Sequence, residues 1–284
     1  MDVLMTGSYG RCGTAIIDHL HDDPAYEFTY LNRSDRPDDH EYGGYETIVA
    51  DIADAAALER AAEGTDAMIH LAGYPDTDGT WEDVLEPNVI GMVNALEAAR
   101  KAELETVVFG STNHVMGMYE LETAPELYFG ADAPFRLTAD DPVRPDSYYG
   151  ASKSFGEDLG RYYVESFEYP KRFHALRICT VNMPEYDHPY GDAEARVDDG
   201  VFERESEEYR QWVARMKGMW QSRRDFAHMI DCCLQADEEG FDIFSGVSDN
   251  DRRWYSIEHA RNAIGYDPQD NAETWDEPPE GRGR

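Results

Sequence analysis

Tyr149 and Lys153 stand four residues apart in a stretch, 149–167, whose sequence predicts a helix, so both side chains lie on one helix face. A tyrosine hydroxyl, with an ordinary pKa of about 10, is a weak base at neutral pH. A lysine ammonium beside it and the positive charge of an oxidised nicotinamide both favour the phenolate and lower that pKa. The pair therefore predicts a base that removes a hydroxyl proton while hydride leaves for the nicotinamide. Lys153 can also bond the nicotinamide ribose.

A second group of reactive side chains reads Ser-Thr-Asn-His and follows a predicted strand. A hydroxyl at this place would hold the substrate oxygen beside Tyr149, and either Ser111 or Thr112 satisfies the spacing. Asn113 and His114 would bond sugar hydroxyls, although a histidine in a loop is more often a satisfied structural residue.

Gly7, Gly10 and Gly13 follow one predicted strand and precede a predicted helix, which is the context of a dinucleotide-binding loop. Gly7 permits a tight turn, Gly10 lets the backbone approach a pyrophosphate, and Gly13 allows close packing of helix on strand. The helix N-terminus then supplies oriented amides to the anion. The spacing differs from the simpler dinucleotide pattern, and an ordinary glycine turn is the alternative interpretation.

The end of the second predicted strand bears on which dinucleotide binds. An acidic residue there accepts bonds from the adenosine ribose and repels a 2′-phosphate. This chain instead has Asn32, Arg33 and Ser34, a set that suits the phosphate of NADP, with Arg11 as a second cation. The sequence therefore favours NADP and leaves NAD possible, the alternative being that Arg33 points to water.

Strand and helix patterns alternate along the chain, which predicts an α/β fold with a doubly wound parallel sheet of Rossmann type and a small C-terminal substrate-binding lobe. The predicted strands are 3–5, 27–31, 47–50, 67–71, 106–109, 172–178 and 243–244. The predicted helices are 14–21, 53–62, 81–101, 149–167, 221–236 and 257–264. Ligands of such sheets bind at the carboxyl ends of the strands.

Three parts are expected along the chain. Residues 1–180 would bind the dinucleotide and carry the catalytic residues, and 181–275 would form the small lobe. Within the lobe, 185–210 is acidic and without a clear period, which predicts an exposed insertion and leaves open whether it closes as a lid. Residues 276–284 read as a disordered tail.

The formal net charge of −34, from 59 acidic and 25 basic residues, predicts strong self-repulsion that salt would screen. We therefore expect a cytoplasmic protein of a salt-accumulating organism and no nucleic-acid partner, because phosphates would be repelled. The sequence has no apolar run long enough for a membrane span and no signal-peptide pattern. Its four cysteines lack metal-ligand spacing, so no metal site is expected.

Several motifs together resemble the extended short-chain dehydrogenase/reductase family. They are the glycine loop, Asp51-Ile52, His70-Leu71-Ala72-Gly73, Asn88, Ser111-Thr112-Asn113-His114 and Tyr149-Gly-Ala-Ser-Lys153. More narrowly, STNHVMG and the segments 215–226 and 248–271 resemble the uronate dehydrogenase branch and its halophilic archaeal relatives, which include glucose-6-phosphate and L-arabinose 1-dehydrogenases. The resemblance implies oxidation of the anomeric carbon of a cyclic aldose to a lactone.

The resemblance also implies roles for residues. The catalytic hydroxyl falls on Thr112, because it directly precedes Asn-His; Tyr149 becomes the base and Lys153 its partner. The implied cofactor-binding residues are Gly7, Tyr9, Gly10, Arg11, Asn32, Arg33, Ser34, Asp51, Ile52, Leu71, Ala72, Gly73, Asn88, Tyr149, Lys153 and Ile178. The implied substrate-binding residues are Pro75, Thr112, Asn113, His114, Tyr149, Thr180 and Arg215.

The match has departures at the substrate. Arg215 matches the arginine that grips the carboxylate in uronate dehydrogenases, but Pro75 and Thr180 replace serines that contact substrate there. The favoured interpretation is therefore an NADP-preferring dehydrogenase of L-arabinose or a similar neutral aldose. Glucose-6-phosphate or uronate dehydrogenase is the alternative, since Arg215, Arg223 and Arg224 could form a phosphate site, and a nucleotide-sugar epimerase is a further one.

The family also implies a homo-oligomer, a dimer or tetramer. Its members often pair through a four-helix interface, which here would involve 81–102 and 149–167. Gly156 and Gly160 on the second segment could mark close helix packing.

Overall fold

Seven strands form one parallel sheet in the computed structural model, which describes residues 1–37, 39–130, 134–204 and 206–279. The strands are β1 (Asp2–Thr6), β2 (Glu27–Asn32), β3 (Thr47–Val49), β4 (Ala67–His70), β5 (Thr106–Thr112), β6 (Arg172–Ile178) and β7 (Gly240–Gly246). Their order across the sheet is β3-β2-β1-β4-β5-β6-β7. The first three strands are added toward one edge of the sheet and the last four toward the other, so the strand order reverses between β1 and β4. The predicted doubly wound parallel sheet is confirmed, and such reversals are where ligands bind.

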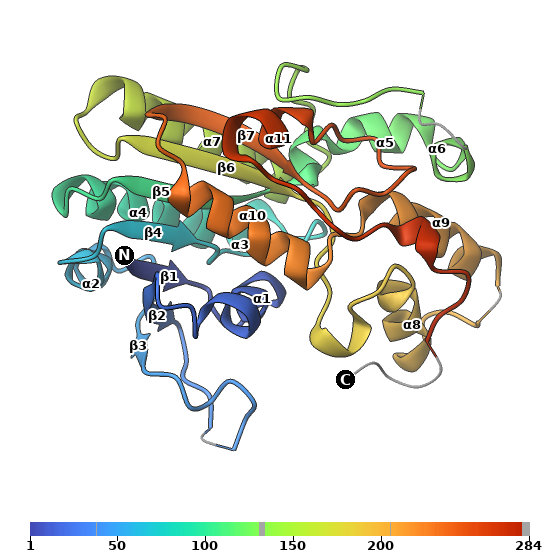
Figure 1. The fold of residues 1–284 in the computed structure, drawn as a ribbon, viewed down its shortest axis with the longest axis horizontal. Coiled ribbons are helices and arrows are strands. Elements are labelled where there is room, and N and C mark those ends of the chain that lie inside the picture. The colour runs from blue at the N-terminus through green and yellow to red at the C-terminus, as the bar shows by residue number, and fades with distance from the viewer. Residues whose placement is uncertain (38, 131–133, 205, 280–284) are drawn as a thin grey trace.

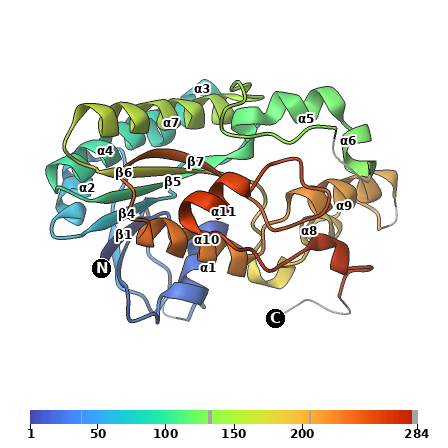
Figure 2. The same cartoon turned by 45° about the horizontal axis from the view of Figure 1, so that its top comes forward.

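Helices cover both faces of this sheet, as Figures 1 and 2 show. Along β1, Val3 and Met5 pack toward one face and Leu4 toward the other, because side chains of a strand alternate. The first face is covered by α1 (Arg11–Leu20), α10 (Arg223–Gln235) and α11 (Glu258–Ile264). The second face is covered by α2 (Ala55–Ala62), α4 (Gly91–Lys101) and α7 (Tyr148–Ser166).

The predicted long helix 81–101 is interrupted in the structure. It consists of α3 (Trp81–Val84), a π-helical turn η1 (Leu85–Ile90) and α4. A π turn fits one additional residue into the helix and is frequent at functional sites. Here it carries Asn88, whose side chain is buried.

Gly156 and Gly160 of α7 face the sheet. A Cβ atom added to Gly156 would lie 2.6 Å from Phe109, and one added to Gly160 would lie 2.4 Å from Phe173. The two glycines therefore let α7 pack closely on β5 and β6, and their conformational freedom plays no part.

The segment 185–210 is more ordered than the sequence indicated. It contains most of a short 3-10 turn, η3 (Pro184–Tyr186), all of helix α8 (Gly191–Asp198) and the start of α9 (Glu207–Met219). Ala193 of α8 is fully buried in a small separate core, which also includes Tyr190, Tyr209 and Val213. The expectation of an exposed stretch is thus wrong for α8, because a few apolar residues among many acidic ones suffice to bury one side of a short helix.

Residues after 180 contribute to both parts of the molecule. Helix α10 packs on the same sheet face as α1, and β7 pairs with β6 along its whole length, so these elements belong to the sheet layers. The expected assignment of all of 181–275 to a separate lobe is corrected accordingly. The sequence also left α5 (Gly117–Thr123) and α6 (Glu126–Phe129) unassigned. Of the expected tail, 280–284 lie outside the described residues.

Within the described part of the chain, the structure contains no helix with the length and hydropathy needed to cross a membrane.

Candidate active site

A cavity of about 1900 Å³ opens at the carboxyl ends of β1, β4, β5 and β6. Pockets for drug-sized ligands measure about 300–1,000 Å³, so this one has room for a dinucleotide and a second small molecule. It is lined by the following residues of the predicted cofactor site: Gly7, Gly10, Arg11, Asn32, Arg33, Asp51, Ile52, Leu71, Ala72, Gly73, Tyr149, Lys153 and Ile178. It is also lined by every predicted substrate-binding residue: Pro75, Thr112, Asn113, His114, Tyr149, Thr180 and Arg215.

At its glycines, the loop after β1 presents backbone to this cavity. Gly7 has φ 75°, a value that favours glycine, and a Cβ there would lie 2.7 Å from the backbone nitrogen of Ala72. A Cβ on Gly13 would lie 2.3 Å from the carbonyl oxygen of Ser8. Gly10 caps α1 without any side-chain hydrogen bond, so the first amides of the helix remain free for an anion. These features fit the pyrophosphate of a dinucleotide.

Asn32, at the end of β2, holds the glycine loop. Its Nδ2 donates to Ser8 Oγ at 2.6 Å, and its Oδ1 accepts from the backbone N–H of Tyr9 at 3.4 Å. The Tyr9 side chain turns away from the cavity, because its hydroxyl bonds Thr47 Oγ1 on β3. Arg33 lines the cavity and has no ion-pair partner among the described residues. Tyr9 and Ser34 do not line the cavity, unlike Asn32 and Arg33.

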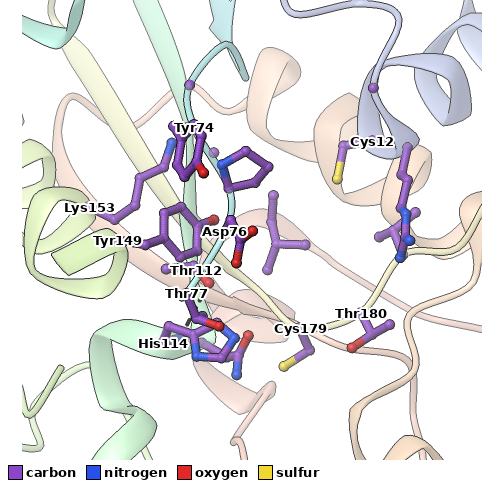
Figure 3. A pocket seen from close by; sticks show the side chains of 18 of the residues that line it. Cys12, Tyr74, Asp76, Thr77, Thr112, His114, Tyr149, Lys153, Cys179 and Thr180 are labelled. Carbon is purple, nitrogen blue, oxygen red and sulfur yellow. Dashed lines mark hydrogen bonds between the residues drawn. The ribbon is translucent and has the colours of Figure 1, made fainter. Parts of the chain in front are cut away.

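The structure separates the two hydroxyls that spacing left open. Both residues line the cavity, but Ser111 Oγ donates to Oε1 of the buried Glu157 at 2.6 Å. The Thr112 hydroxyl is hydrogen-bonded to Tyr149 instead. In Figure 3, Tyr149 lies between Thr112 and Lys153. The geometry therefore places Thr112, and not Ser111, next to Tyr149.

Burial dominates the acid–base properties of this group. It raises the pKa of Tyr149 to about 12, against the opposing effect of the Thr112 hydrogen bond. It also lowers the pKa of Lys153 to about 8. The expected lowering of the tyrosine pKa depends on Lys153 together with an oxidised nicotinamide; in the protein alone, desolvation of the phenolate dominates and the pKa is raised. A further positive charge beside Tyr149 is needed to favour its ionised form.

Asn88, on the π turn, is buried behind the cavity. Its Oδ1 accepts from the backbone N–H of Tyr74 at 2.7 Å, and its Nδ2 donates to the Tyr74 carbonyl and to Ser152 Oγ. Ser152 is the neighbour of Lys153 in α7, and its hydroxyl donates to the Tyr149 carbonyl at 2.7 Å. Asn88 thus ties the loop after β4 to the start of α7, and it supports the geometry without lining the cavity.

His114 and Asn113 face the other end of the cavity. His114 Nδ1 lies 2.7 Å from Asp146 Oδ2, and Ser147 Oγ donates to the other oxygen of Asp146. Although burial raises the pKa of Asp146, these hydrogen bonds hold it below its ordinary value. Asn113 is 3% exposed, and its Nδ2 has no hydrogen-bond acceptor among the described residues. Such an orphaned buried donor points to a missing acceptor.

Arg215, from α9, is not free in the structure. It forms a two-pronged ion pair with Glu120 of α5, in which Arg215 Nη2 and Glu120 Oε2 are 3.1 Å apart. The hydroxyl of Tyr128 donates to Glu120 Oε1 at 2.8 Å. Burial opposes the arginine's charge, but the adjacent Glu120 raises the pKa of Arg215 above its ordinary value.

Glu120, Tyr128 and Asp146 belong to the site but are not among the residues predicted from the sequence. Asp146 could have been found from the sequence, because it lies three positions before Tyr149, just before the start of the same predicted helix. Glu120 could not have been found, because it meets Arg215 across 95 positions of the sequence in a chain rich in carboxylates.

Comparisons with known proteins agree with this geometry. Residues 3–235 match the NAD dependent epimerase/dehydratase family. The chain is 37% identical over 274 residues to an NAD-dependent glucose-6-phosphate dehydrogenase of Haloferax volcanii, covering 95% of this chain and 94% of that protein. It is 34% identical over 276 residues to the L-arabinose 1-dehydrogenase (NAD(P)(+)) of the same organism, with coverage of 96% and 98%.

Among solved structures, uronate dehydrogenase from Agrobacterium tumefaciens superposes with a TM-score of 0.73 at 29% identity, covering 98% of this chain and 90% of that chain. A glucuronic acid dehydrogenase from Chromohalobacter salexigens also gives 0.73, at 30% identity and with coverage of 96% and 86%.

Proposed function

The chain belongs to the NAD dependent epimerase/dehydratase family, and we propose that within it the protein is an NAD(P)-dependent dehydrogenase that oxidises the anomeric carbon of a cyclic aldose to the lactone. One observation carries the proposal: Thr112, Tyr149 and Lys153 line the same cavity as the glycine loop, where the first amides of α1 are free to bind an anion. The relatives named as sugar dehydrogenases, which match nearly the whole chain, support the same reaction class.

The chemistry follows from these side chains. A bound oxidised nicotinamide dinucleotide would supply the hydride acceptor and a positive charge. Thr112 and Tyr149 hold the C1 hydroxyl between their own hydroxyls, and Tyr149 takes its proton as the C1–H bond breaks. Lys153, fixed at the floor of the cavity with Nζ 4.8 Å from the centre of the Phe109 ring, favours the phenolate by its charge. Asn113 and His114 orient the remaining sugar hydroxyls.

For the cofactor we propose a preference for NADP, with NAD as a possible second cofactor. Arg33 supports this, because it lines the nucleotide end of the cavity and has no ion-pair partner among the described residues. Asn32 supports it as well, since its neutral amide, used in holding the glycine loop, would not repel a 2′-phosphate.

For the substrate we favour a neutral aldose such as L-arabinose over glucose 6-phosphate or a uronate. The cavity has more carboxylates than cationic side chains along its lining, which opposes an anionic sugar. Among the three arginines that could form a phosphate site, Arg223 is not available to a ligand, because it is buried and bonds Asp18 and backbone carbonyls.

An absorbance assay of NAD(P)H formation in molar KCl tests the function. It would compare NADP and NAD with L-arabinose, other aldoses, uronates and glucose 6-phosphate. Turnover of a neutral aldose is the expected result. Turnover of glucose 6-phosphate alone would assign the protein to sugar phosphates, and the absence of net cofactor reduction with every sugar would favour a redox-neutral epimerase.

We further propose a homo-oligomer in the cytoplasm of a salt-accumulating cell. Exposed aromatic and aliphatic side chains on α3, η1 and α7, among them Trp81, Ile90, Phe155 and Tyr162, support pairing through these helices. Light scattering measures the mass.

A melting temperature that fails to rise with KCl would contradict the proposal of a salt-accumulating cell. At a net charge of −34, repulsion between the acidic side chains should destabilise the protein most at low ionic strength.

A further inference from the structure

Glu120 and Arg215 form the most completely buried ion pair on the wall of the cavity. Their side chains are 6% and 14% exposed, and both residues line the cavity. Tyr128 donates a third hydrogen bond to the carboxylate, and the Trp212 ring lies 5.4 Å from the guanidinium. The pair is therefore built into the site and held from several elements.

Glu120 follows the candidate catalytic hydroxyl along one short segment of the chain. Strand β5 ends at Thr112, the 3-10 turn η2 (Asn113–Met116) carries Asn113 and His114, and α5 follows directly with Glu120 on its first turn. The same short segment therefore supplies the candidate catalytic hydroxyl, the candidate sugar contacts and the carboxylate that holds Arg215.

We propose that Glu120 is a specificity-determining residue: by holding Arg215 it restricts the site to aldoses that carry no anionic group. This inference rests on the proposed function. Glu120 occupies the Nε–Nη2 edge of Arg215, so a sugar carboxylate or phosphate that takes this two-pronged edge must displace Glu120 and leave a buried carboxylate without its partner, which is strongly unfavourable. An anion that approaches the Nη1 side instead meets a guanidinium whose charge Glu120 already neutralises, and the Glu120 carboxylate repels it. A neutral sugar needs no such displacement, because its hydroxyls can bond the outer edges of the intact pair.

The neighbouring cations do not offer a substitute. Arg196 of α8 lies 3.1 Å from Asp192, and Arg11 lies 3.4 Å from the other oxygen of the same carboxylate. An anionic sugar thus meets paired arginines at each of these positions.

A second buried pair provides a matched control. Arg177 and Glu157 form the same two-pronged contact, with distances of 3.0 and 2.8 Å and side chains each 3% exposed. They lie between β6 and α7 and do not line the cavity. The substitution Glu157→Gln therefore removes the same charge in the same kind of pair, but without reaching the sugar.

The test compares D-glucose with D-glucuronate, which differ only in a hydroxymethyl or carboxylate group, using kcat and KM measured separately. We expect the wild-type protein to prefer glucose, and Glu120→Gln to shift the ratio of kcat/KM toward glucuronate by about tenfold or more, mainly through KM, because a charged hydrogen bond becomes available to the substrate. Glu157→Gln should leave that ratio within about twofold, whatever it does to the melting temperature.

Two further variants guard against a folding artefact. Tyr128→Phe keeps every charge but loosens Glu120, so it should shift the ratio in the same direction by a smaller factor. Glu120→Gln combined with Arg215→Met should abolish the gain for glucuronate. Wild-type preference for glucuronate, or equal ratios in Glu120→Gln and Glu157→Gln, would overturn the proposal.

Failure of the proposed function has a different result. In that case the wild-type protein reduces neither cofactor with any sugar, and binding is then measured by the rise in melting temperature with glucuronate. A larger rise for Glu120→Gln than for wild type and Glu157→Gln would still support the role of Glu120, and equal rises would reject it.

Discussion

The two ends of the cavity are constructed by different means. At the end proposed for the nucleotide, the loop after β1 presents backbone at its glycines, and a Cβ added to Gly7 or Gly13 would meet the main chain. At the end proposed for the sugar, side chains from β5, α5 and α9 face the space, and Glu120 and Arg215 are already paired with each other. The first end suits a ligand that is bound through its phosphates by backbone groups. The second end can discriminate between ligands by the charge and shape of their side groups.

The comparison shows where a change of specificity can arise at low cost. A backbone site tolerates few substitutions, because each added atom meets the main chain. A side-chain site can be altered one partner at a time, since its charges are balanced within the site.

Tyr149→Phe should give the largest effect, because it removes the proton acceptor that stands between the two ends. We expect kcat to fall by about 10³-fold while cofactor binding, followed by fluorescence titration, stays near the wild-type value. Retained turnover would mean that another group takes the proton.

The pH dependence should be nearly as large. In the proposed reaction the active form of Tyr149 is the phenolate. Burial raises the pKa of its hydroxyl to about 12, so at every pH below that value the active fraction grows as pH rises. At low cofactor concentration kcat/KM should therefore increase by up to about tenfold per pH unit between pH 6 and 8. Above the Lys153 pKa of about 8 the lysine loses its charge, and the increase should flatten. A flat profile over the whole range would exclude Tyr149 as the titrating base.

Gly7→Ala tests the nucleotide end alone. The new Cβ would meet the Ala72 backbone at 2.7 Å at a φ of 75°, so we expect the KM for the cofactor to rise about tenfold or more and the sugar preference to stay unchanged. Gly44→Ala is the matched control, because nothing lies within 4 Å of its added Cβ. Equal effects of the two changes would show that the loop does not bind the cofactor.

Arg33→Ala should give the smallest change, confined to the choice between dinucleotides. Loss of a charged hydrogen bond predicts a fall of about tenfold in kcat/KM for NADP relative to NAD. Arg60→Ala, an exposed arginine at the end of α2, controls for the loss of one positive charge. An unchanged ratio of kcat/KM would mean that Arg33 does not bind the 2′-phosphate or that the protein does not prefer NADP.

The same contrast explains what the sequence could and could not predict. The sheet, the helices of its two layers and the glycine loop follow from local patterns, because periodicity and turn chemistry act between near neighbours. The Glu120–Arg215 pair depends on how α5 and α9 meet, and no local pattern reports that. Spacing alone does not distinguish Thr112 from Ser111. The distinction depends on Glu157 of α7, which accepts the hydrogen bond of the Ser111 hydroxyl.

Helix α8 was missed for a related reason. Its buried side rests on Ala193 and on aromatic residues that other segments supply, so the acidic composition of the segment concealed its packing. The direction of the Tyr149 pKa was also beyond the sequence, because it depends on how deeply the whole fold encloses the phenol.

The pairing of β7 with β6 has a consequence for how the chain is made. Every residue of β6, from Arg172 to Ile178, has its partner in Gly240–Gly246, so an open strand edge persists until the ribosome has delivered some seventy further residues. Most of the lobe is synthesised in that interval and would have to emerge beside an unfinished sheet. A late edge strand of this kind means that the sheet can be completed only after most of the lobe has been translated.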